Sequence, residues 1–194
     1  MLGIAALSVV AALALCAMAS FGLLVYAKVR HEFRSELAAK TVNTNFSKID
    51  SRFPADTPTV NPDYPAGTCV HLHTTATHMQ LSKAECGAPD NNYFVIQQVR
   101  KHTDCVSDTE QRYWDTNTAD GGEWTACLDY YWARGNCLSI GKYEATRGRC
   151  DDRSHPNREK PLSVILNTTT NAGCPTGGFP HAVRKFTICT ETQK

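Results

Sequence analysis

The sequence lacks an excess of charge of either sign. Its 194 residues include 20 Lys and Arg against 19 Asp and Glu, so the formal net charge is +1. Proteins that bind nucleic acid normally carry a clustered excess of Lys and Arg, because the phosphate backbone is polyanionic. We therefore expect no nucleic-acid partner.

Sequence motifs of common enzyme active sites are also missing. The chain contains no Gly-x-Gly-x-x-Gly, no Walker loop and no Gly-x-Ser-x-Gly. Thiol catalysis needs a cysteine of low pKa, usually in Cys-x-x-Cys or beside a histidine. No two of the nine cysteines have the Cys-x-x-Cys spacing. We expect a protein that is not an enzyme and that has no cofactor.

Charge is absent from residues 1–27, and the run from Leu2 to Ala27 is almost wholly apolar. As a helix this run is about 39 Å long, against about 30 Å for the hydrocarbon core of a bilayer. A cleaved signal peptide has a basic start and a shorter apolar stretch. A lipoprotein cleavage site needs a small residue before the cysteine, whereas Leu15 precedes Cys16. The run predicts a retained single-pass transmembrane helix over residues 1–27, and lipidation of Cys16 stays open.

The other eight cysteines are widely spaced in the polar part of the chain, from Cys69 to Cys189. Structural zinc sites use short-spaced cysteine pairs, so this spacing favours four disulfides, which persist in an oxidising compartment. The positive-inside rule favours the opposite orientation, because four basic residues follow the apolar run: Lys28, Arg30, Arg34 and Lys40. Long domains translocate with little regard to such charges. We predict a cytoplasmic N-terminus and an extracytoplasmic, periplasmic-side bulk in the cell membrane.

Two segments join the predicted membrane helix to the cysteine-rich region. Residues 28–45 have apolar residues at four-residue spacing, which predicts a helical stalk. Residues 46–65 hold four prolines, which favour an extended, semi-rigid course. This spacer either sets the height of the domain above the bilayer or is a linker of no special length.

The region after residue 65 contains an internal repeat, with copies at residues 66–132 and 133–194. The four cysteines of one copy recur in the other in the same order, at offsets of 68, 64, 69 and 62 residues. Short runs rich in Val, Ile, Thr, Tyr and Phe are separated by turn residues, which predicts strands. We expect a mainly β fold (α+β is the alternative) of two tandem disulfide-stapled repeats. Residues 108–114 are the best helix candidate within them.

Four cysteines in a copy allow three pairings. We favour the first with the second and the third with the fourth, because the strand around Cys69 and the strand ending at Cys86 can form a hairpin. The predicted disulfides are Cys69–Cys86, Cys105–Cys127, Cys137–Cys150 and Cys174–Cys189.

Three further groups of residues are candidates for binding. His71 and His73 point to one face of a strand, and with His78 they could ligate a metal; the alternative, which we favour, is exposed polar residues and no metal. A basic cluster faces acidic lipids or a partner, or is a solvated loop: Arg147, Arg149, Arg153, Arg158 and Lys160. Three adjacent aromatic residues form a possible interface, either between the copies or with a partner: Tyr130, Tyr131 and Trp132.

The cysteine motifs resemble a known family. These motifs are Gly-x-Cys-Val, x-Cys-x-x-Pro with Asn or Asp and Tyr-x-Val, and a closing aromatic-Thr-x-Cys-Leu. With them the chain resembles actinobacterial envelope proteins of the LppU lipoprotein type, and more loosely septum-formation-type domains. The resemblance spans about residues 66–190, although the second copy lacks the Pro-Asp-Asn-Asn stretch after its second cysteine. It implies an anchored extracytoplasmic module without an established catalytic mechanism.

These features favour a non-catalytic accessory, assembly or stabilising subunit of a bacterial cell-envelope membrane complex. Respiratory, secretion, lipid-transport and division complexes are all compatible, and the partners are then the bilayer and a larger integral membrane complex. The alternative is a ligand-binding module for a cell-wall or lipid fragment, with its site between the copies near Tyr131 and Trp132.

Overall fold

The computed structural model describes residues 44–194 except residue 56 and residues 117–121, and these residues belong to one compact unit, Val42–Lys194. The predicted transmembrane helix at 1–27 and nearly all of the stalk at 28–45 lie outside the described residues. In the part of the chain that is described, no helix is both long enough and apolar enough to cross a membrane.

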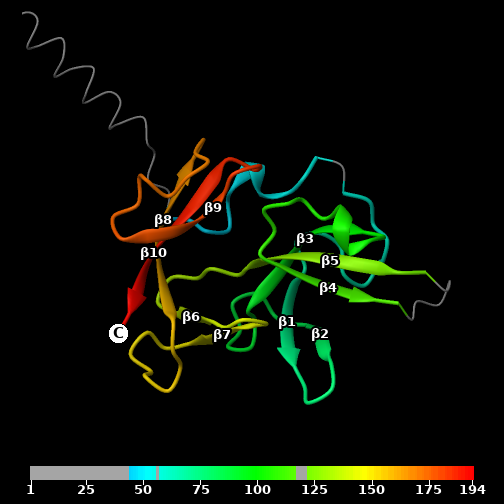
Figure 1. Ribbon diagram of the computed structural model, residues 1–194, viewed down its shortest axis with the longest axis horizontal. Helices are drawn as coiled ribbons and strands as arrows, with labels where there is room; N and C mark the ends of the chain where they lie inside the picture. The colour runs from blue at the N-terminus through cyan, green and yellow to red at the C-terminus, as the bar shows by residue number, and fades with distance from the viewer. Residues whose placement is uncertain (1–43, 56, 117–121) are drawn as a thin grey trace, which may run out of the picture. The chain divides into compact units, whose positions relative to one another are not determined.

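The first repeat forms a five-stranded antiparallel sheet in the order β2-β1-β3-β5-β4 (Figure 1). Its strands are β1 (Cys69–Thr74), β2 (Met79–Lys83), β3 (Tyr93–Val99), β4 (Gln111–Asp115) and β5 (Trp124–Tyr130). Successive side chains of a strand point to opposite faces of the sheet. In β1, Val70 and Leu72 lie in the core, and the alternating His71 and His73 point to the other face. The core is completed from the central strands, with Val95 of β3 among its members.

The second repeat forms a second five-stranded antiparallel sheet in the order β7-β6-β8-β10-β9. Its strands are β6 (Cys137–Ile140), β7 (Ala145–Gly148), β8 (Arg158–Leu166), β9 (Gly177–His181) and β10 (Phe186–Gln193). Strand for strand this is the order of the first sheet, so the two repeats share one topology. The described residues also include two short 3-10 helices, η1 (Asp50–Arg52) and η2 (His102–Asp104). The predicted mainly β class is confirmed.

The prediction of a helix over residues 108–114 is wrong. Most of this segment is β4, which pairs with β5 from Gln111 opposite Leu128 to Asp115 opposite Trp124. The backbone hydrogen bonds that a helix would make internally are made across the sheet. Adjacent Tyr and Trp favour a strand, because aromatic side chains pack well on a pleated surface.

Four disulfides cross-link the sheets, and each of them joins two cysteines of the same repeat. They are Cys69–Cys86, Cys105–Cys127, Cys137–Cys150 and Cys174–Cys189, the pairings favoured from the sequence. Each bridge joins a strand end or interior to a neighbouring loop or strand. Since a repeat of about 60 residues has little core of its own, these cross-links supply part of its stability.

Residues 46–65, expected as a spacer, belong to the folded unit. Phe46 and Ile49 are buried in the core of the second sheet, and Val60 and Tyr64 pack against the core of the first. The side-chain oxygen of the buried Gln98 accepts hydrogen bonds from two backbone N–H groups of this segment, at 2.8 and 2.6 Å. The segment therefore runs from one sheet to the other (Figure 1). The segment contains no α-helix, only η1, and its apolar residues pack against the repeats.

Candidate functional site

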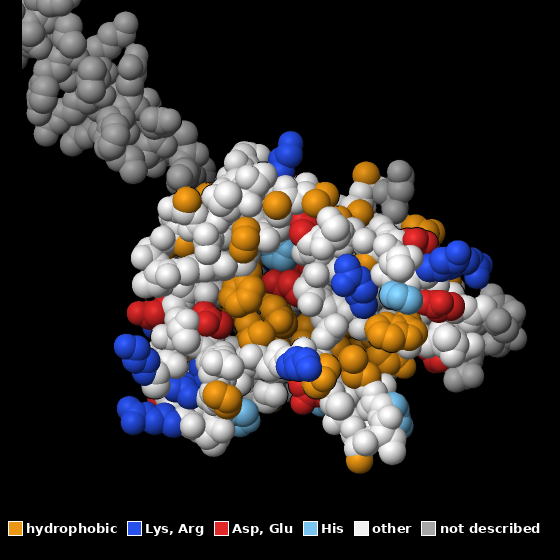
Figure 2. Space-filling model, in the orientation of Figure 1, with side chains coloured by type: hydrophobic (Ala, Val, Ile, Leu, Met, Phe, Trp, Pro, Cys, Tyr) orange, Lys and Arg blue, Asp and Glu red, His pale blue; other side chains and the backbone are white. Residues whose placement is uncertain are grey.

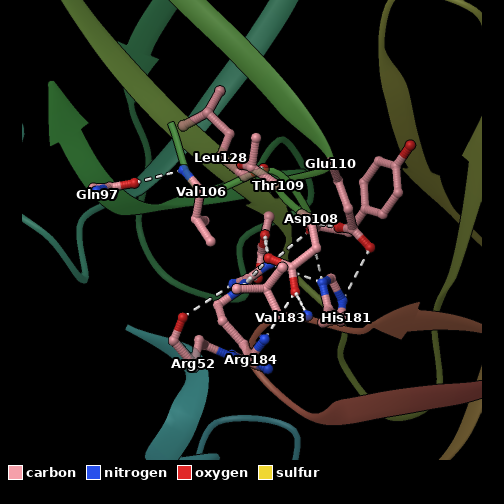
Figure 3. A network of polar contacts seen from close by, with 12 residues as sticks. Arg52, Gln97, Val106, Asp108, Thr109, Glu110, Leu128, His181, Val183 and Arg184 are labelled. Carbon is pink, nitrogen blue, oxygen red and sulfur yellow. Dashed lines mark hydrogen bonds and ion pairs between the residues drawn. The ribbon is translucent and has the colours of Figure 1, made fainter. Parts of the chain in front are cut away.

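Acidic side chains of the first repeat meet basic side chains of the second in a buried network at the junction of the two sheets (Figure 3). The acidic groups come from the turn before β4, from the residue that precedes β4 and from β5. The basic groups come from the end of β9 and from the β9–β10 turn. The members are Asp108, Glu110, Asp129, His181 and Arg184, with Arg52 of η1 beside them.

Arg184 is the centre of this network. Its Nε donates to Asp108 Oδ1 at 2.8 Å, and its two Nη groups donate to both carboxylate oxygens of Asp129 at 2.6 and 3.0 Å. The backbone N–H groups of Val183 and Arg184 donate to Asp108 Oδ2 at 2.8 and 2.9 Å. The planar guanidinium suits such two-pronged pairing, and every one of these bonds is charge-assisted. Arg184 thus links the second repeat to two separate elements of the first.

The pKa shifts agree with this geometry. Burial alone would raise the pKa of the Asp108 carboxyl, but the hydrogen bonds and charge of Arg184 hold it below its ordinary value. Burial would likewise lower the pKa of Arg184, and its hydrogen bonds to Asp129 and Asp108 raise it instead. Both carboxylate contacts therefore stabilise the charged forms in a dry environment.

Glu110 and His181 form a second buried pair. Glu110 Oε1 lies 3.4 Å from His181 Nε2, and Glu110 Oε2 accepts a hydrogen bond from the backbone N–H of Tyr130. Burial raises the pKa of Glu110, and the nearby histidine offsets only part of that effect. Burial would lower the pKa of His181, but the contact with Glu110 raises it. On the other side of the ring, His181 Nδ1 lies 2.8 Å from Arg184 Nη2 and 3.0 Å from the backbone oxygen of Asp108.

The charges in the network balance. Arg52 and Arg184 offset Asp108 and Asp129, and the pair of Glu110 and His181 is neutral when it holds one proton in total. Arg52 also places its guanidinium carbon 4.5 Å from the centre of the Phe94 ring, and burial lowers the pKa of Arg52 to about 10. The network joins side chains of both sheets, and within it Arg52 Nε and Glu110 Oε1 are buried without a hydrogen-bond partner among the described residues.

The three adjacent aromatic residues also lie at the junction. Trp132 is buried in the core of the second sheet, and the Tyr130 ring lies 5.3 Å from Tyr93 and 5.8 Å from Phe179, one in each repeat. The guanidinium carbon of Arg147 lies over the Tyr131 ring, 5.4 Å from the centre of that ring. Of the two alternatives raised from the sequence, this geometry matches packing between the copies.

The candidate metal-binding histidines are only partly brought together. The rings of His71 and His73 stack on the outer face of β1 with centres 4.7 Å apart. His78 lies in the β1–β2 turn, where its Nδ1 is 2.8 Å from the hydroxyl of Thr77. Among the residues that the structure describes, no three His, Cys, Asp or Glu side chains are arranged to hold a metal ion.

Much of the basic cluster has structural partners. Arg147 Nε donates to the backbone oxygen of Asn91 at 2.6 Å, across the junction. Arg158 is buried and donates to the backbone oxygen of Lys194 at 2.9 Å. Arg149 pairs with Asp151 at 2.7 Å on the surface. The cluster is therefore dispersed among several roles, and only part of it faces solvent.

The sequence reasoning missed the Arg184 network entirely. Its strongest pairs join residues 76 and 55 positions apart in the chain. Asp108 and Arg184 occupy different places in their repeats, so aligning the two copies does not pair them. Nothing in the local sequence distinguishes these charges from solvated surface residues.

Comparison of the chain with protein-family models, with curated proteins and with solved structures found no match. The resemblance to LppU-type envelope proteins therefore stays a hypothesis that depends on the cysteine motifs. The function must be argued from the geometry described above.

Proposed function

We propose that the chain is a non-catalytic, membrane-anchored extracytoplasmic protein that acts as an accessory or stabilising subunit of a cell-envelope membrane complex. The observation that carries the proposal is the Arg184 network. It fixes two disulfide-stapled repeats in one arrangement, and a docking module with a preorganised surface loses less entropy on binding.

The position of the domain supports membrane docking. Phe46 is already buried in the second sheet, so at most residues 28–45 separate the predicted membrane helix from the folded unit. If these 18 residues are helical, they span about 27 Å. The domain then stays close to the bilayer, within reach of the extracytoplasmic face of an integral membrane protein.

The disulfides support the location. All eight cysteines outside the predicted membrane helix are paired. Disulfides of this density persist in oxidising compartments and are rare in the cytosol. This agrees with the proposed orientation, with the N-terminus inside and the repeats outside.

A pull-down from native membranes tests the proposal. The tag belongs at the C-terminus behind a flexible linker, because the Lys194 backbone oxygen accepts a bond from Arg158. In mild detergent we expect one larger membrane protein to copurify at a fixed ratio. Arg184→Met should lose that partner, whereas Arg149→Met, which alters an exposed pair, should retain it. Recovery of the wild-type chain as a lone monomer would contradict the proposal.

A ligand-binding module is the second candidate. A pocket of about 440 Å³ lies beside Tyr131 and Trp132, where the sequence places the site, and it is lined by residues 44–47 and 131–134. The exposed rings of Trp114 and Tyr143 mark a second candidate place for a ligand. Their surroundings favour a specific class of ligand.

A further inference from the structure

Two adjoining pockets lie where the tip of the β1–β2 hairpin approaches β4 and the β6–β7 turn. One has a volume of about 290 Å³ and is lined by His78, Met79, Arg112, Tyr113 and Trp114. The other has a volume of about 250 Å³ and is lined by residues 74–79 and Tyr143. His78 and Met79 line both pockets, and we call the two pockets together the hairpin groove.

Both repeats build the hairpin groove, and hydrogen bonds fix its walls. Gln111 Nε2 of β4 donates to the backbone oxygen of Tyr143 at 2.7 Å. The backbone N–H of Thr74, at the end of β1, donates to Glu144 Oε2 at 2.5 Å. The edge of the first sheet is thereby tied to the β6–β7 turn of the second repeat. The groove is preformed, as small-molecule sites usually are.

An exposed aromatic ring lines each of the two pockets. Trp114 is 48% exposed and Tyr143 is 55% exposed, unusually high values for such large apolar side chains. Neighbouring groups support both rings: the His102 ring lies 5.2 Å from Trp114, and Lys142 Nζ lies 4.9 Å from the centre of Tyr143. Figure 2 shows hydrophobic side chains on the face that carries β4, β2 and the β6–β7 turn, with Lys and Arg side chains beside them.

Polar groups line the pockets beside apolar ones. Hydroxyl groups come from Thr74, Thr75 and Thr77, an imidazole from His78 and a guanidinium from Arg112. Within the turn, the Thr75 hydroxyl donates to the backbone oxygen of His78 at 2.8 Å, and the Thr77 hydroxyl lies 2.8 Å from His78 Nδ1. A hydroxyl can both donate and accept, so these groups can also meet a ligand. A lipid tail needs a deep apolar cavity, whereas these pockets are small and carry hydroxyl and charged groups.

We propose that the hairpin groove binds a short saccharide chain. A pyranose ring has a face of C–H groups that stacks on Trp or Tyr, and hydroxyl groups around its rim that bond to polar side chains. Two exposed aromatic rings, each in a pocket that also carries donors and acceptors, match both properties for more than one sugar unit. Tyr and Trp supply such contact area at low entropy cost. This binding is independent of the membrane partner proposed above.

Tryptophan fluorescence of the full chain provides the test, because the chain has three tryptophans and Trp124 and Trp132 are buried. Trp114 is therefore the one that responds directly to a ligand at the surface. The probes are chitotriose, cellotriose and maltotriose, and the detergent must have no sugar headgroup. We expect at least one trisaccharide to change the emission in a saturable manner. If none does so at about 10 mM, far above a useful affinity, the proposal is refuted.

Variants then locate the site by calorimetry. Trp114→Ala and Tyr143→Ala should each weaken binding about tenfold or more, as expected when an aromatic anchor is removed. Phe53→Ala is the matched control, since Phe53 is 43% exposed and lies outside the groove. Thermal unfolding shows that each variant is folded. Unchanged binding by Trp114→Ala would overturn the assignment, and neither result depends on the pull-down from membranes.

Discussion

Replacement of Arg184 by Met should separate the stabilities of the two repeats. The Met side chain keeps much of the apolar volume but leaves the buried Asp129 and the partly buried Asp108 without their guanidinium partner. Removing one member of a buried ion pair typically lowers the free energy of unfolding by about 3–5 kcal/mol, because the remaining charge is uncompensated. Total stabilities are about 5–15 kcal/mol, so the loss is a large fraction of the whole.

The two buried tryptophans provide an assay for each repeat. Trp124 lies in the core of the first sheet and Trp132 in the core of the second. In a Trp114→Phe background, a further Trp132→Phe or Trp124→Phe change leaves one reporter for urea unfolding with intact disulfides. With Arg184 present, we expect both reporters to give the same midpoint. In Arg184→Met, we expect the midpoints to fall and to separate.

Two controls isolate the cause. Arg149→Met makes the same substitution in an exposed ion pair, in which the Arg149 side chain is 81% exposed. This variant should leave the unfolding midpoints unchanged. Adding Asp129→Asn to Arg184→Met removes one uncompensated charge and should recover part of the loss. If Arg184→Met shifts stability by less than about 1 kcal/mol, the value typical of surface pairs, the network does not hold the repeats together.

Three further perturbations test other parts of the structure. Gly178→Ala places a Cβ 2.6 Å from the backbone oxygen of Ile188, so the strand must shift and thermal unfolding should begin at a lower temperature; an unchanged profile would contradict the close approach. The Cys137–Cys150 bridge spans 13 residues, and replacing both cysteines by Ser should lower the free energy of unfolding by about 3 kcal/mol on the chain-entropy model. Urea titration of the variant and the wild type measures this difference. The pKa values of Glu110 and His181 are raised above their ordinary 4.5 and 6.5. The unfolded chain therefore releases these protons at a lower pH than the folded chain, and the stability they contribute should fall as the pH rises above the ordinary values. Urea midpoints that rise as the pH increases above 6.5 would contradict this.

The mainly β class and the disulfide pairing follow from local sequence. Cys69 and Cys86 flank a hairpin whose strands alternate apolar and polar residues, so the register that buries Val70 and Leu72 also brings the cysteines together. The same local logic holds in the second repeat, which is why the pairing was predictable. These features need only contacts between residues that are near one another in the chain.

The junction, the covered segment and the hairpin groove were decided by tertiary structure. The partners of Arg184 lie 76 and 55 positions away, and no local pattern marks a charge that will be buried. Residues 46–65 were read as a free spacer because prolines exclude a helix but do not report what covers Phe46 or Ile49. The strand at Gln111–Asp115 depends on pairing with β5, which lies beside it in the first sheet. For the junction, the covered segment and the hairpin groove, the deciding contacts join segments whose proximity depends on how the two repeats pack, and that packing is absent from the amino-acid pattern of either segment alone.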